Sequence, residues 1–271
     1  MQLSCNSFEK LAEFTQKNNQ LNKIINLLRN DFNLTPCFGV EIEFYLEADI
    51  DSIEFEHNLD LKLKKEKGCN QFEIDLPPST DLKNYIEKIE FYKNKIISVA
   101  KFLGGKANLL AKPYGNDYGN GMHFHLNFAQ RQDRKFTEII ANILCNFMLE
   151  TFLVFMPKEE DYARIDKNFM TPVCVSFGGN NRSVGVRIPD SLPIRIEHRL
   201  SSPQADPYLA MFTIIKSIYL GLKYPEKMRK YQKIYGNAFD EQYNQQLFPA
   251  SKQAAEKLFN WQFFTKNNFV L

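Results

Sequence analysis

Polar and apolar residues alternate along four short stretches of the chain, which is the pattern of strands with one buried face. In residues 38–46, FGVEIEFYL, apolar side chains fill every second position and Glu41 and Glu43 fall between them. Successive side chains of a strand point to opposite faces, so both carboxylates should lie opposite the apolar side chains. The pattern predicts a strand that faces a core on one side and carries two like charges on the other.

Three later stretches repeat this alternation with chemically active residues on the polar face. These residues are Gln71, Glu73 and Asp75 in QFEID, His123, His125 and Asn127 in MHFHLNF, and Arg195, Glu197 and Arg199 in IRIEHRL. A single strand of this kind is an ordinary solvated sheet face. Four such strands rich in Glu, His and Arg predict a charged concave surface, with a purely structural network of ion pairs as the alternative.

Apolar residues at spacings of three and four predict long helices between the strands. We expect helices at 7–32, 135–156, 207–222 and 251–261, and a further long helix that begins at PPSTD, with Thr80 as its cap, and ends at Gly104-Gly105. We expect strands at 38–46, 52–56, 61–65, 71–76, 122–128, 184–188 and 194–200. Strand runs joined by hairpin-like loops and mixed with long helices indicate an α+β fold with a mainly antiparallel sheet. No repeat or interdomain linker interrupts the pattern, so we expect one domain over residues 1–271, with a helical lead-in at 1–36.

The composition narrows the class of protein. Of the 271 residues, 44% are hydrophobic and 24% charged, as in ordinary globular proteins, and the net charge of +2 argues against a nucleic-acid binder. Five scattered cysteines form no CxxC pair, and the first residues lack a basic and apolar leader, so we expect reduced thiols and a cytoplasmic location. Polar residues interrupt the most apolar stretch, 139–156, which favours a buried helix over a membrane span.

The four polar faces together have the composition of a metal site. Two unit charges about 4 Å apart repel by roughly 4 kcal/mol at an effective dielectric of about 20, so clustered glutamates need cations nearby. Oxygen-rich clusters with one imidazole suit Mg²⁺ or Mn²⁺ better than Zn²⁺. Divalent ions beside several arginines are the groups that phosphoryl transfer requires. The chain has no P-loop, dinucleotide-binding, HExxH or GxSxG motif, and a Ser or Cys nucleophile paired with His123 or His125 has no local support.

Five motifs resemble the catalytic domain of glutamine synthetases. GVEIEF, EKGCNQFEI, NGMHFH, NNRSVGVRIP and RIEHRLSSPQADPYLA occur in the order and at the approximate spacing of that family, from about residue 37 to at least residue 222. The resemblance implies a curved antiparallel sheet, a half-barrel, whose inner face binds two or three divalent cations and ATP. It also implies phosphorylation of a substrate carboxylate, followed by displacement of phosphate by an amine.

The resemblance also implies roles for individual residues, motif by motif. Glu43, Glu66 and Glu73 match the ligands of one metal ion, and Glu41, His123 and Glu197 match those of a second. His125, Asn127, Arg187 and Arg195 match positions that line the nucleotide, and Arg182 matches the arginine on the transferred phosphoryl group. Gly119, Arg164 and Arg199 match positions that hold the substrate amino acid. Glu41 and Glu43 would then be close together because each serves a different ion.

The chain departs from the family pattern where ammonia is bound. Only about 37 mainly helical residues precede GVEIEF, so we expect the family's small N-terminal β domain, and with it the family-type ring, to be absent. Met170, in KNFMTPV, occupies the position of the glutamate in the family's flap, and Tyr118 that of the asparagine in the glutamate-binding loop. The phosphorylating half of the site should be retained and the ammonia half altered. Asp166 would take the role of base if the flap alignment were shifted by a few residues.

The sequence-based hypothesis is an ATP- and Mg²⁺- or Mn²⁺-dependent carboxylate–amine ligase of amino-acid metabolism, acting on glutamate or a related amino acid. A phosphotransferase that stops at the phosphorylated product and a non-catalytic nucleotide or amino-acid sensor are the alternatives. The expected partners are ATP and a small amino-acid-like substrate, with no nucleic acid and no membrane, and with a homo-oligomer left open. ATP turnover separates the enzymes from the sensor, and amine dependence separates the ligase from the phosphotransferase.

Overall fold

A nine-stranded open sheet with helices packed against it is the main feature of the computed structural model, which describes residues 11, 13, 15–16 and 19–265. The strand order is β2-β3-β1-β5-β8-β7-β6-β9, and β4 pairs with β1 beside this path. The strands are β1 (Pro36–Glu47), β2 (Leu63–Lys65), β3 (Gln71–Ser79), β4 (Lys106–Asn108), β5 (Met122–Phe128), β6 (Phe177–Gly178), β7 (Val186–Arg187), β8 (Ile196–His198) and β9 (Lys233–Ile234). Most pairs are antiparallel, as predicted, but β6 pairs in parallel with β7 and with β9.

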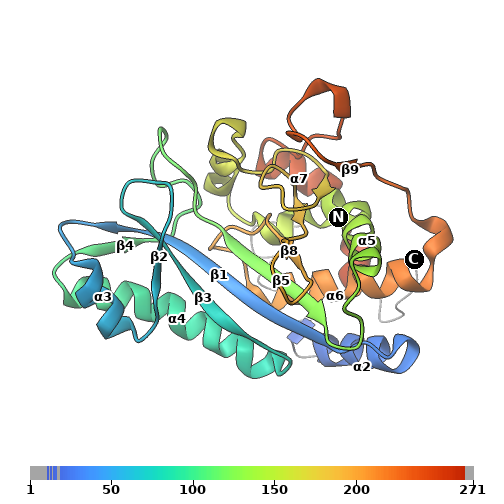
Figure 1. Cartoon of the computed structure of the whole chain (residues 1–271), viewed down its shortest axis with the longest axis horizontal. Coiled ribbons are helices and arrows are strands. Elements are labelled where there is room, and N and C mark those ends of the chain that lie inside the picture. The colour runs from blue at the N-terminus through green and yellow to red at the C-terminus, as the bar shows by residue number, and fades with distance from the viewer. Residues whose placement is uncertain (1–10, 12, 14, 17–18, 266–271) are drawn as a thin grey trace.

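The helices cover the apolar side of this sheet. They are α2 (Gln20–Phe32), α3 (Ser52–Leu59), α4 (Leu82–Phe102), α5 (Arg134–Phe155), α6 (Pro207–Lys223), α7 (Lys252–Leu258) and α8 (Trp261–Thr265). Short 3₁₀ helices lie at η1 (Glu159–Arg164), η2 (Lys167–Phe169), η3 (Pro225–Lys227) and η4 (Glu241–Tyr243). In Figure 1, α4 runs alongside the long strands β1 and β3, and α6 lies between α2 and α5.

The alternation in residues 38–46 produces the expected division between the two sheet faces. Val40, Ile42 and Phe44 are at most 1% exposed and belong to one large hydrophobic cluster that also contains buried residues of every helix from α2 to α7. Burying side chains of this size removes their apolar area from water, contributing about 1.5–3 kcal/mol each. The apolar half of β1 therefore anchors the strand, and the intervening carboxylates have to lie on the other face.

Aspartates cap the long helices. The side chain of Asp81 accepts a hydrogen bond from the backbone N–H of Asn84, so Asp81 and not Thr80 caps α4. A cap residue directly precedes the first helical residue, which is Leu82, and this position corrects the expectation for Thr80. At the other end Gly104 has φ of 80°, a left-handed conformation that ends the helix as predicted.

Two other expected elements differ from the structure. Residues 52–56 form the start of helix α3 and not a strand, because Asp51 caps the segment and Phe55 and Leu59, four residues apart, are its buried residues. Ile53, in the same segment, is 79% exposed. Helix 7–32 is confirmed over 20–32. Of residues 7–19, the described positions 11, 13, 15 and 16 are helical, and 7–10, 12, 14, 17 and 18 lie outside the described part of the chain.

Helix α5 is the one described helix long and apolar enough, by length and composition, to cross a membrane. About 67% of its most apolar window is buried inside the protein. The helix contacts α6, α7 and strands β6, β7 and β8. Its apolar residues are therefore used in the core, as the interrupted pattern at 139–156 predicts.

Candidate active site

The register of the sheet lines up polar residues from neighbouring strands. Glu41 of β1 lies opposite His123 of β5, and Glu43 lies opposite Glu73 of β3. His125 of β5 in turn lies opposite Glu197 of β8. Directly opposed residues on paired strands have their side chains on the same face. A row of carboxylates and imidazoles therefore crosses four adjacent strands.

A first carboxylate group is formed by the three residues predicted to hold one metal ion. One oxygen each of Glu43, Glu66 and Glu73 lies within 4.8 Å of the other two. Burial, followed by repulsion from the neighbouring carboxylates, raises the pKa of Glu73 to about 10. Burial and the charge of Glu43 raise the pKa of Glu66 as well. The group thus has the oxygen ligands of a hard divalent cation, and such an ion would favour the ionised form of these carboxyl groups.

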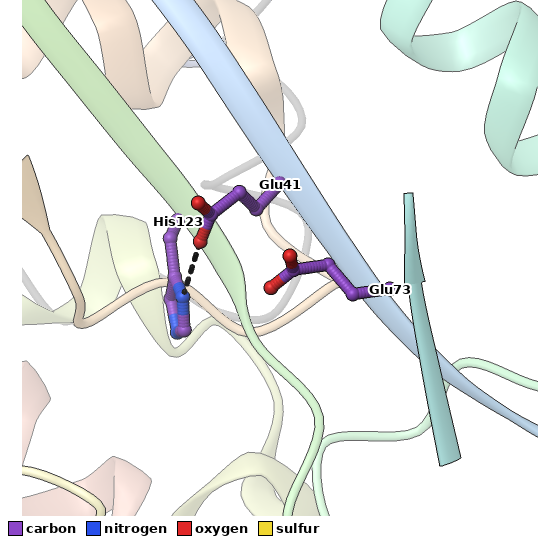
Figure 2. Close-up of side chains that lie close together, drawn as sticks. All are labelled: Glu41, Glu73 and His123. Carbon is purple, nitrogen blue, oxygen red and sulfur yellow. Dashed lines mark hydrogen bonds and ion pairs between the residues drawn. The ribbon is translucent and has the colours of Figure 1, made fainter. Parts of the chain in front are cut away.

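The residues predicted to hold the other ion, Glu41, His123 and Glu197, lie close together but fall into two sets of potential ligands, one of Glu41, His123 and Glu73 and one of Glu41, Glu197 and His125. Nδ1 of His123 lies 3.4 Å from Oε2 of Glu41 and 3.5 Å from Oε1 of Glu197. Figure 2 shows the side chains of Glu41, Glu73 and His123 converging from three adjacent strands. His125, predicted to line the nucleotide, also approaches this group, because its Nε2 lies 2.8 Å from Oε1 of Glu41.

Opposing electrostatic effects keep Glu41 ionised. Burial would raise the pKa of Glu41, but hydrogen bonds to His123 and His125 and the charges of these rings hold it well below its usual value. Glu41 also belongs to two sets of potential ligands, one with Glu73 and His123 and one with His125 and Glu197. It therefore lies at the junction between the two groups.

Arginines already occupy both carboxylate oxygens of Glu197. Nη1 of Arg187 donates to Oε2 over 2.7 Å, and Nη1 of Arg199 donates to Oε1. Burial would raise the pKa of Glu197, but Arg199 and His123 lower it to about 2. This part of the site is an ion-pair network, as the alternative interpretation of the polar faces predicts, and it contains one predicted metal ligand.

Four residues predicted to contact the substrate or its phosphoryl group line one small cavity of about 40 Å³. These are Gly119, Arg164, Arg182 and Arg199, and the same cavity is lined by Glu43, Glu66, Gln71, Tyr118, His123, Phe169, Met170 and Thr171. Arg164 is 3% exposed and donates to the backbone carbonyls of Leu200 and Arg199. Burial, followed by the charge of Arg199, lowers its pKa to about 10, so the guanidinium remains charged at neutral pH.

A larger cavity of about 360 Å³ lies next to Glu41 and is lined by three of the four predicted nucleotide residues. These are His125, Asn127 and Arg195, and Nε of Arg195 donates to Nδ1 of His125 over 3.0 Å. The fourth, Arg187, does not line this cavity but donates to Glu197 and to Asn180. The apolar walls come from Leu76, Pro77, Pro78, Leu192 and Pro193, which sequence reasoning did not assign to the site.

The segment around Met170 closes over the small cavity. The rings of Tyr118 and Phe169 meet edge to face with centroids 5.4 Å apart, and Nζ of Lys112 lies 3.5 Å from the Phe169 centroid. Met170 has φ of 57° and lines this cavity, whereas Asp166 lines a different one. Sequence reasoning missed Lys112 and Phe169, because no periodic pattern marks two loop residues that meet only in the fold.

Comparison with known proteins gives one family. The model of the family described as "Glutamine synthetase, catalytic domain" matches residues 50–269. The gamma-glutamylputrescine synthetase of Escherichia coli (strain K12) is 26% identical over 190 residues, covering 65% of this chain and 40% of the relative. The glutamine synthetase of Pyrococcus woesei is 30% identical over 173 residues, covering 60% of this chain and 39% of the relative. The chain thus spans about two fifths of the length of these relatives.

Solved structures support the same fold. A structure described as "GmaS/ADP complex-Conformation 1" has a TM-score of 0.73 and 20% identity, covering 91% of this chain and 68% of the other. The Plasmodium falciparum glutamine synthetase has a TM-score of 0.74 and 16% identity, covering 92% and 72%. Both alignments cover more than nine tenths of this chain and therefore include the helices as well as the sheet.

Proposed function

Because the chain belongs to the glutamine synthetase family, we propose that it is an ATP-dependent carboxylate–amine ligase that requires Mg²⁺ or Mn²⁺. The observation that carries this proposal is the group formed by Glu43, Glu66 and Glu73 at the edge of a cavity lined by Arg164, Arg182 and Arg199. Clustered buried carboxylates beside several guanidinium groups suit a phosphate held between divalent cations and arginines.

The two carboxylate groups are the proposed cation sites. Glu43, Glu66 and Glu73 would hold one ion, and Glu41, His123 and Glu197 a second. When bound, such ions neutralise phosphate oxygens and make the terminal phosphoryl group easier to transfer. The surroundings of Glu73 fit this role, because its pKa of about 10 reflects burial and then repulsion from neighbouring carboxylates, and a bound cation would offset both.

The cavity of about 360 Å³ is the proposed nucleotide site. Its apolar walls can pack on a purine base, and the polar groups of Asn127, His125 and Arg195 lie on the same surface. Glu41 lines this cavity and also belongs to the second group of ligands, so the phosphate end of the nucleotide would point toward the metal sites.

Two balanced steps follow from this arrangement. In the first, a substrate carboxylate attacks the γ-phosphorus, the bond to the β-phosphate oxygen breaks, and an acyl phosphate and ADP form. In the second, the nitrogen of a deprotonated amine attacks the acyl carbon, the carbon–nitrogen bond forms and inorganic phosphate leaves with the oxygen. The amine gives up one proton before the attack and one after it. Arg182 would stabilise the phosphoryl oxygens, and Arg164 and Arg199 would hold the acceptor, which we propose is glutamate or a related amino acid.

The identity of the amine follows from the segment that closes the site. Met170 supplies an apolar side chain at the position where the family has the flap glutamate, and the two carboxylates of this cavity, Glu43 and Glu66, are assigned to the first cation. A larger amine can pack its carbon chain on Met170 and would suffer less from the missing charge. We therefore propose an alkylamine and not free ammonia as the preferred second substrate.

ADP release tests this proposal directly. The full chain, with Mg²⁺ or Mn²⁺ and ATP, is assayed across a panel of amino acids, each with and without ammonium or alkylamines. ADP that requires both a carboxylate and an amine supports the ligase. ADP release with a stable phosphorylated product and no amine dependence would favour the phosphotransferase alternative instead. Nucleotide binding without turnover would favour the sensor.

The matched variants are Glu73→Gln and Glu47→Gln. Both residues are strand glutamates of the same sheet, but Glu47 lies at the end of β1, where Asn108 and Lys106 are its partners. We expect Glu73→Gln to abolish turnover and Glu47→Gln to retain it. Equal activity of the two variants would contradict the proposed cation site.

A further inference from the structure

A lysine outside the predicted set of site residues lies beside the first carboxylate group. Lys64 of β2 is directly opposite Glu73 of β3, and its Nζ lies 3.5 Å from Oε1 of Glu73. The same ammonium also forms an ion pair with Asp75, the next residue on that face of β3. The run LKLKKEKG predicts a strand here, but nothing in it distinguishes one lysine from the others as part of a site.

The pairing of β2 with β3 separates this lysine from the adjacent one. Leu63, the residue before it, packs against the hydrophobic core, so the alternation of the strand places Lys64 on the polar face. Lys65 has other partners: its Nζ donates to the backbone carbonyl of Gly68 and lies 4.6 Å from the centroid of the Phe72 ring. Two adjacent lysines of one strand therefore have different surroundings, and Lys64 is the one that contacts carboxylates of the polar face.

The two carboxylates bound to Lys64 belong to two different proposed binding regions. Asp75 lines the cavity of about 360 Å³ that we assign to the nucleotide. Glu73 belongs to the first carboxylate group and also to a set with Glu41 and His123, toward which its side chain is directed in Figure 2. A nucleotide whose base lies in the cavity has to extend its phosphates across this boundary to reach the cations. Lys64 therefore has the charge and the position of a phosphate ligand.

The ammonium of Lys64 has donor capacity for such a ligand. A lysine ammonium has three N–H donors, and its partners in the described part of the chain are the carboxylates of Glu73 and Asp75. The side chain is 54% exposed, so the remaining donor is open to solvent. A lysine that is exposed to this extent keeps its charge at neutral pH. An anionic oxygen can therefore bind without first removing either carboxylate.

A divalent cation at the first carboxylate group would change the surroundings of Lys64. In the free protein the ammonium offsets part of the negative charge of Glu73, so it competes with any cation that uses this carboxylate. Once Glu73 is a ligand of such a cation, its attraction for the ammonium is weaker. The oxygens of a triphosphate are strong acceptors, and a lysine side chain is long and flexible enough to turn from a neighbouring carboxylate toward them.

We propose that Lys64 exchanges partners between the free and the loaded protein. It neutralises Glu73 and Asp75 in the free protein, and it binds the polyphosphate of the nucleotide once a divalent cation occupies the first carboxylate group. This inference rests on the proposed function, since it assigns a further residue to the nucleotide and cation sites of that reaction. Removal of the lysine then has two effects of opposite sign. A divalent cation alone binds more tightly because its competitor is gone, and the nucleotide binds more weakly because a phosphate ligand is gone.

Calorimetry with the full chain measures both effects without turnover. The variants are Lys64→Met and, as the matched control, Lys65→Met, which removes the same charge from the adjacent residue of the same strand. An exposed ion pair contributes at most about a factor of five, so we expect Lys64→Met to bind Mn²⁺ about threefold to fivefold more tightly than Lys65→Met does. With Mg²⁺ in excess, Lys64→Met should bind the β,γ-imido analogue of ATP about fivefold more weakly than the control. Lys64→Arg keeps the charge and should return both affinities toward those of the wild type.

A purely structural ion pair between the strands predicts a different result. Strand β2 is a three-residue strand at the edge of the sheet, where lysines are common for reasons unrelated to ligands. If Lys64 only stabilised this edge, Lys64→Met would lower the melting temperature and would bind Mn²⁺ no more tightly than Lys65→Met. That result, or an unchanged affinity for the nucleotide analogue, would overturn the inference. Should Lys64→Met fail to fold, Lys64→Gln, which keeps donors for both carboxylates, takes its place with the same expected outcomes and with Lys65→Gln as the control.

Failure of this inference and failure of the proposed function give different results. If the wild type binds Mn²⁺ and Glu43→Gln does not, the cation site stands, and equal Mn²⁺ affinities of Lys64→Met and Lys65→Met would reject the exchange of partners alone. If the wild type and both lysine variants fail to bind Mn²⁺, the cation site is rejected and this inference with it. In the ADP assay, Lys64→Met should raise KM for Mg-ATP about fivefold and change KM for the other substrates less than about twofold. An equal rise in every KM would indicate general damage to the site and would overturn the assignment of Lys64 to the phosphates.

Discussion

Glu41 and Glu43 lie two residues apart on one strand face and yet have different partners. Glu41 lies opposite His123 and close to His125, and Glu43 lies opposite Glu73. The two imidazoles lower the pKa of Glu41, whereas burial, followed by repulsion from neighbouring carboxylates, raises the pKa of Glu73 to about 10. One strand therefore separates a carboxylate compensated by two imidazoles from a cluster of carboxylates in which Glu73 has Lys64 as an ion-pair partner at 3.5 Å, which is an arrangement suited to two different cations.

Loss of Glu43 should weaken cation binding. In the wild type, Mn²⁺ at 100 times its dissociation constant should stabilise the fold by about 2.7 kcal/mol. Glu43→Gln removes one charged oxygen ligand, and we expect at least a tenfold loss of affinity, measured by calorimetry. Glu47→Gln, in the same strand, should bind Mn²⁺ as the wild type does. Wild-type affinity in Glu43→Gln would favour a purely structural role for the cluster.

Arg195 should contribute to nucleotide binding. It lines the cavity of about 360 Å³ together with Asn127 and is oriented by its hydrogen bond to His125. Mg-ATP should raise the melting temperature of the wild type, and Arg195→Gln should lose most of this shift because the site loses a positive charge near the phosphates. Arg229→Gln, an exposed arginine elsewhere, should keep the full shift. An undiminished shift in Arg195→Gln would argue against this cavity as the nucleotide site.

Formation of glutamine from ammonia should be slow or absent. Held as a cation, ammonium needs anionic groups, and removing its proton needs a positioned base, neither of which Met170 supplies. A coupled assay with glutamate, Mg-ATP and ammonium should stay below about one turnover per second, a normal enzyme rate. Faster turnover that disappears in Asp166→Ala would assign the base to Asp166, although Asp166 lines the other cavity. Met170→Glu alone should restore little activity.

Lys216 should make folding stability depend on pH in the alkaline range. Burial in α6 lowers its pKa from 10.5 to about 8 in the folded state, where it donates to the carbonyl of Phe263. The unfolded chain holds this proton more tightly, so stability rises with pH between about 8 and 10.5, by on the order of 3 kcal/mol. Lys216→Met should remove this rise. Denaturant unfolding at pH 7, 8, 9 and 10 measures the difference, and parallel curves for the two proteins would contradict the expectation.

Close packing between α5 and α6 should make Gly221 intolerant of a side chain. A Cβ at this position would lie 2.3 Å from Cγ2 of Ile143, a buried residue of α5. Gly221→Ala should therefore destabilise the protein by about 1–3 kcal/mol. Gly115→Ala is the control, because a Cβ there meets no atom within 4 Å. A melting temperature of Gly221→Ala equal to that of the control would show that the helices separate easily.

The sequence predicted those parts of the fold in which a strict period coincides with burial. Strand β5 and helices α4 and α5 lie within a residue or two of the expected bounds, because apolar residues repeat through each of them. Strands β6 and β9 have two residues each and carry no period, so only their tertiary pairing defines them. The prediction of a strand at 52–56 was wrong, because the buried residues of this segment, Phe55 and Leu59, are spaced as on a helix face while Ile53 is exposed.

The candidate site, too, could be predicted only in part from the sequence. The polar strand residues could be predicted to share a face, and the family resemblance grouped Glu66 with Glu43 and Glu73 although Glu66 lies in the turn before β3. The contact between Lys112 and Phe169, and the part of the 360 Å³ cavity wall that Leu192 and Pro193 form, depend on loop conformations. No local pattern encodes these contacts, because Lys112 and Phe169, and likewise Leu192 and the β3 residues across the cavity, are far apart in the sequence.

The arginines bonded to Glu197 affect the order in which ligands bind. Both oxygens of this carboxylate accept from guanidinium groups, so a cation that binds one of them competes with Arg187 or Arg199 for its negative charge. A guanidinium whose ion pair is weakened in this way becomes more available to an incoming phosphate or carboxylate. Metal and substrates should therefore bind cooperatively, each increasing the affinity for the other by the same factor, and the free protein should remain in a self-neutralised resting state until the first cation arrives.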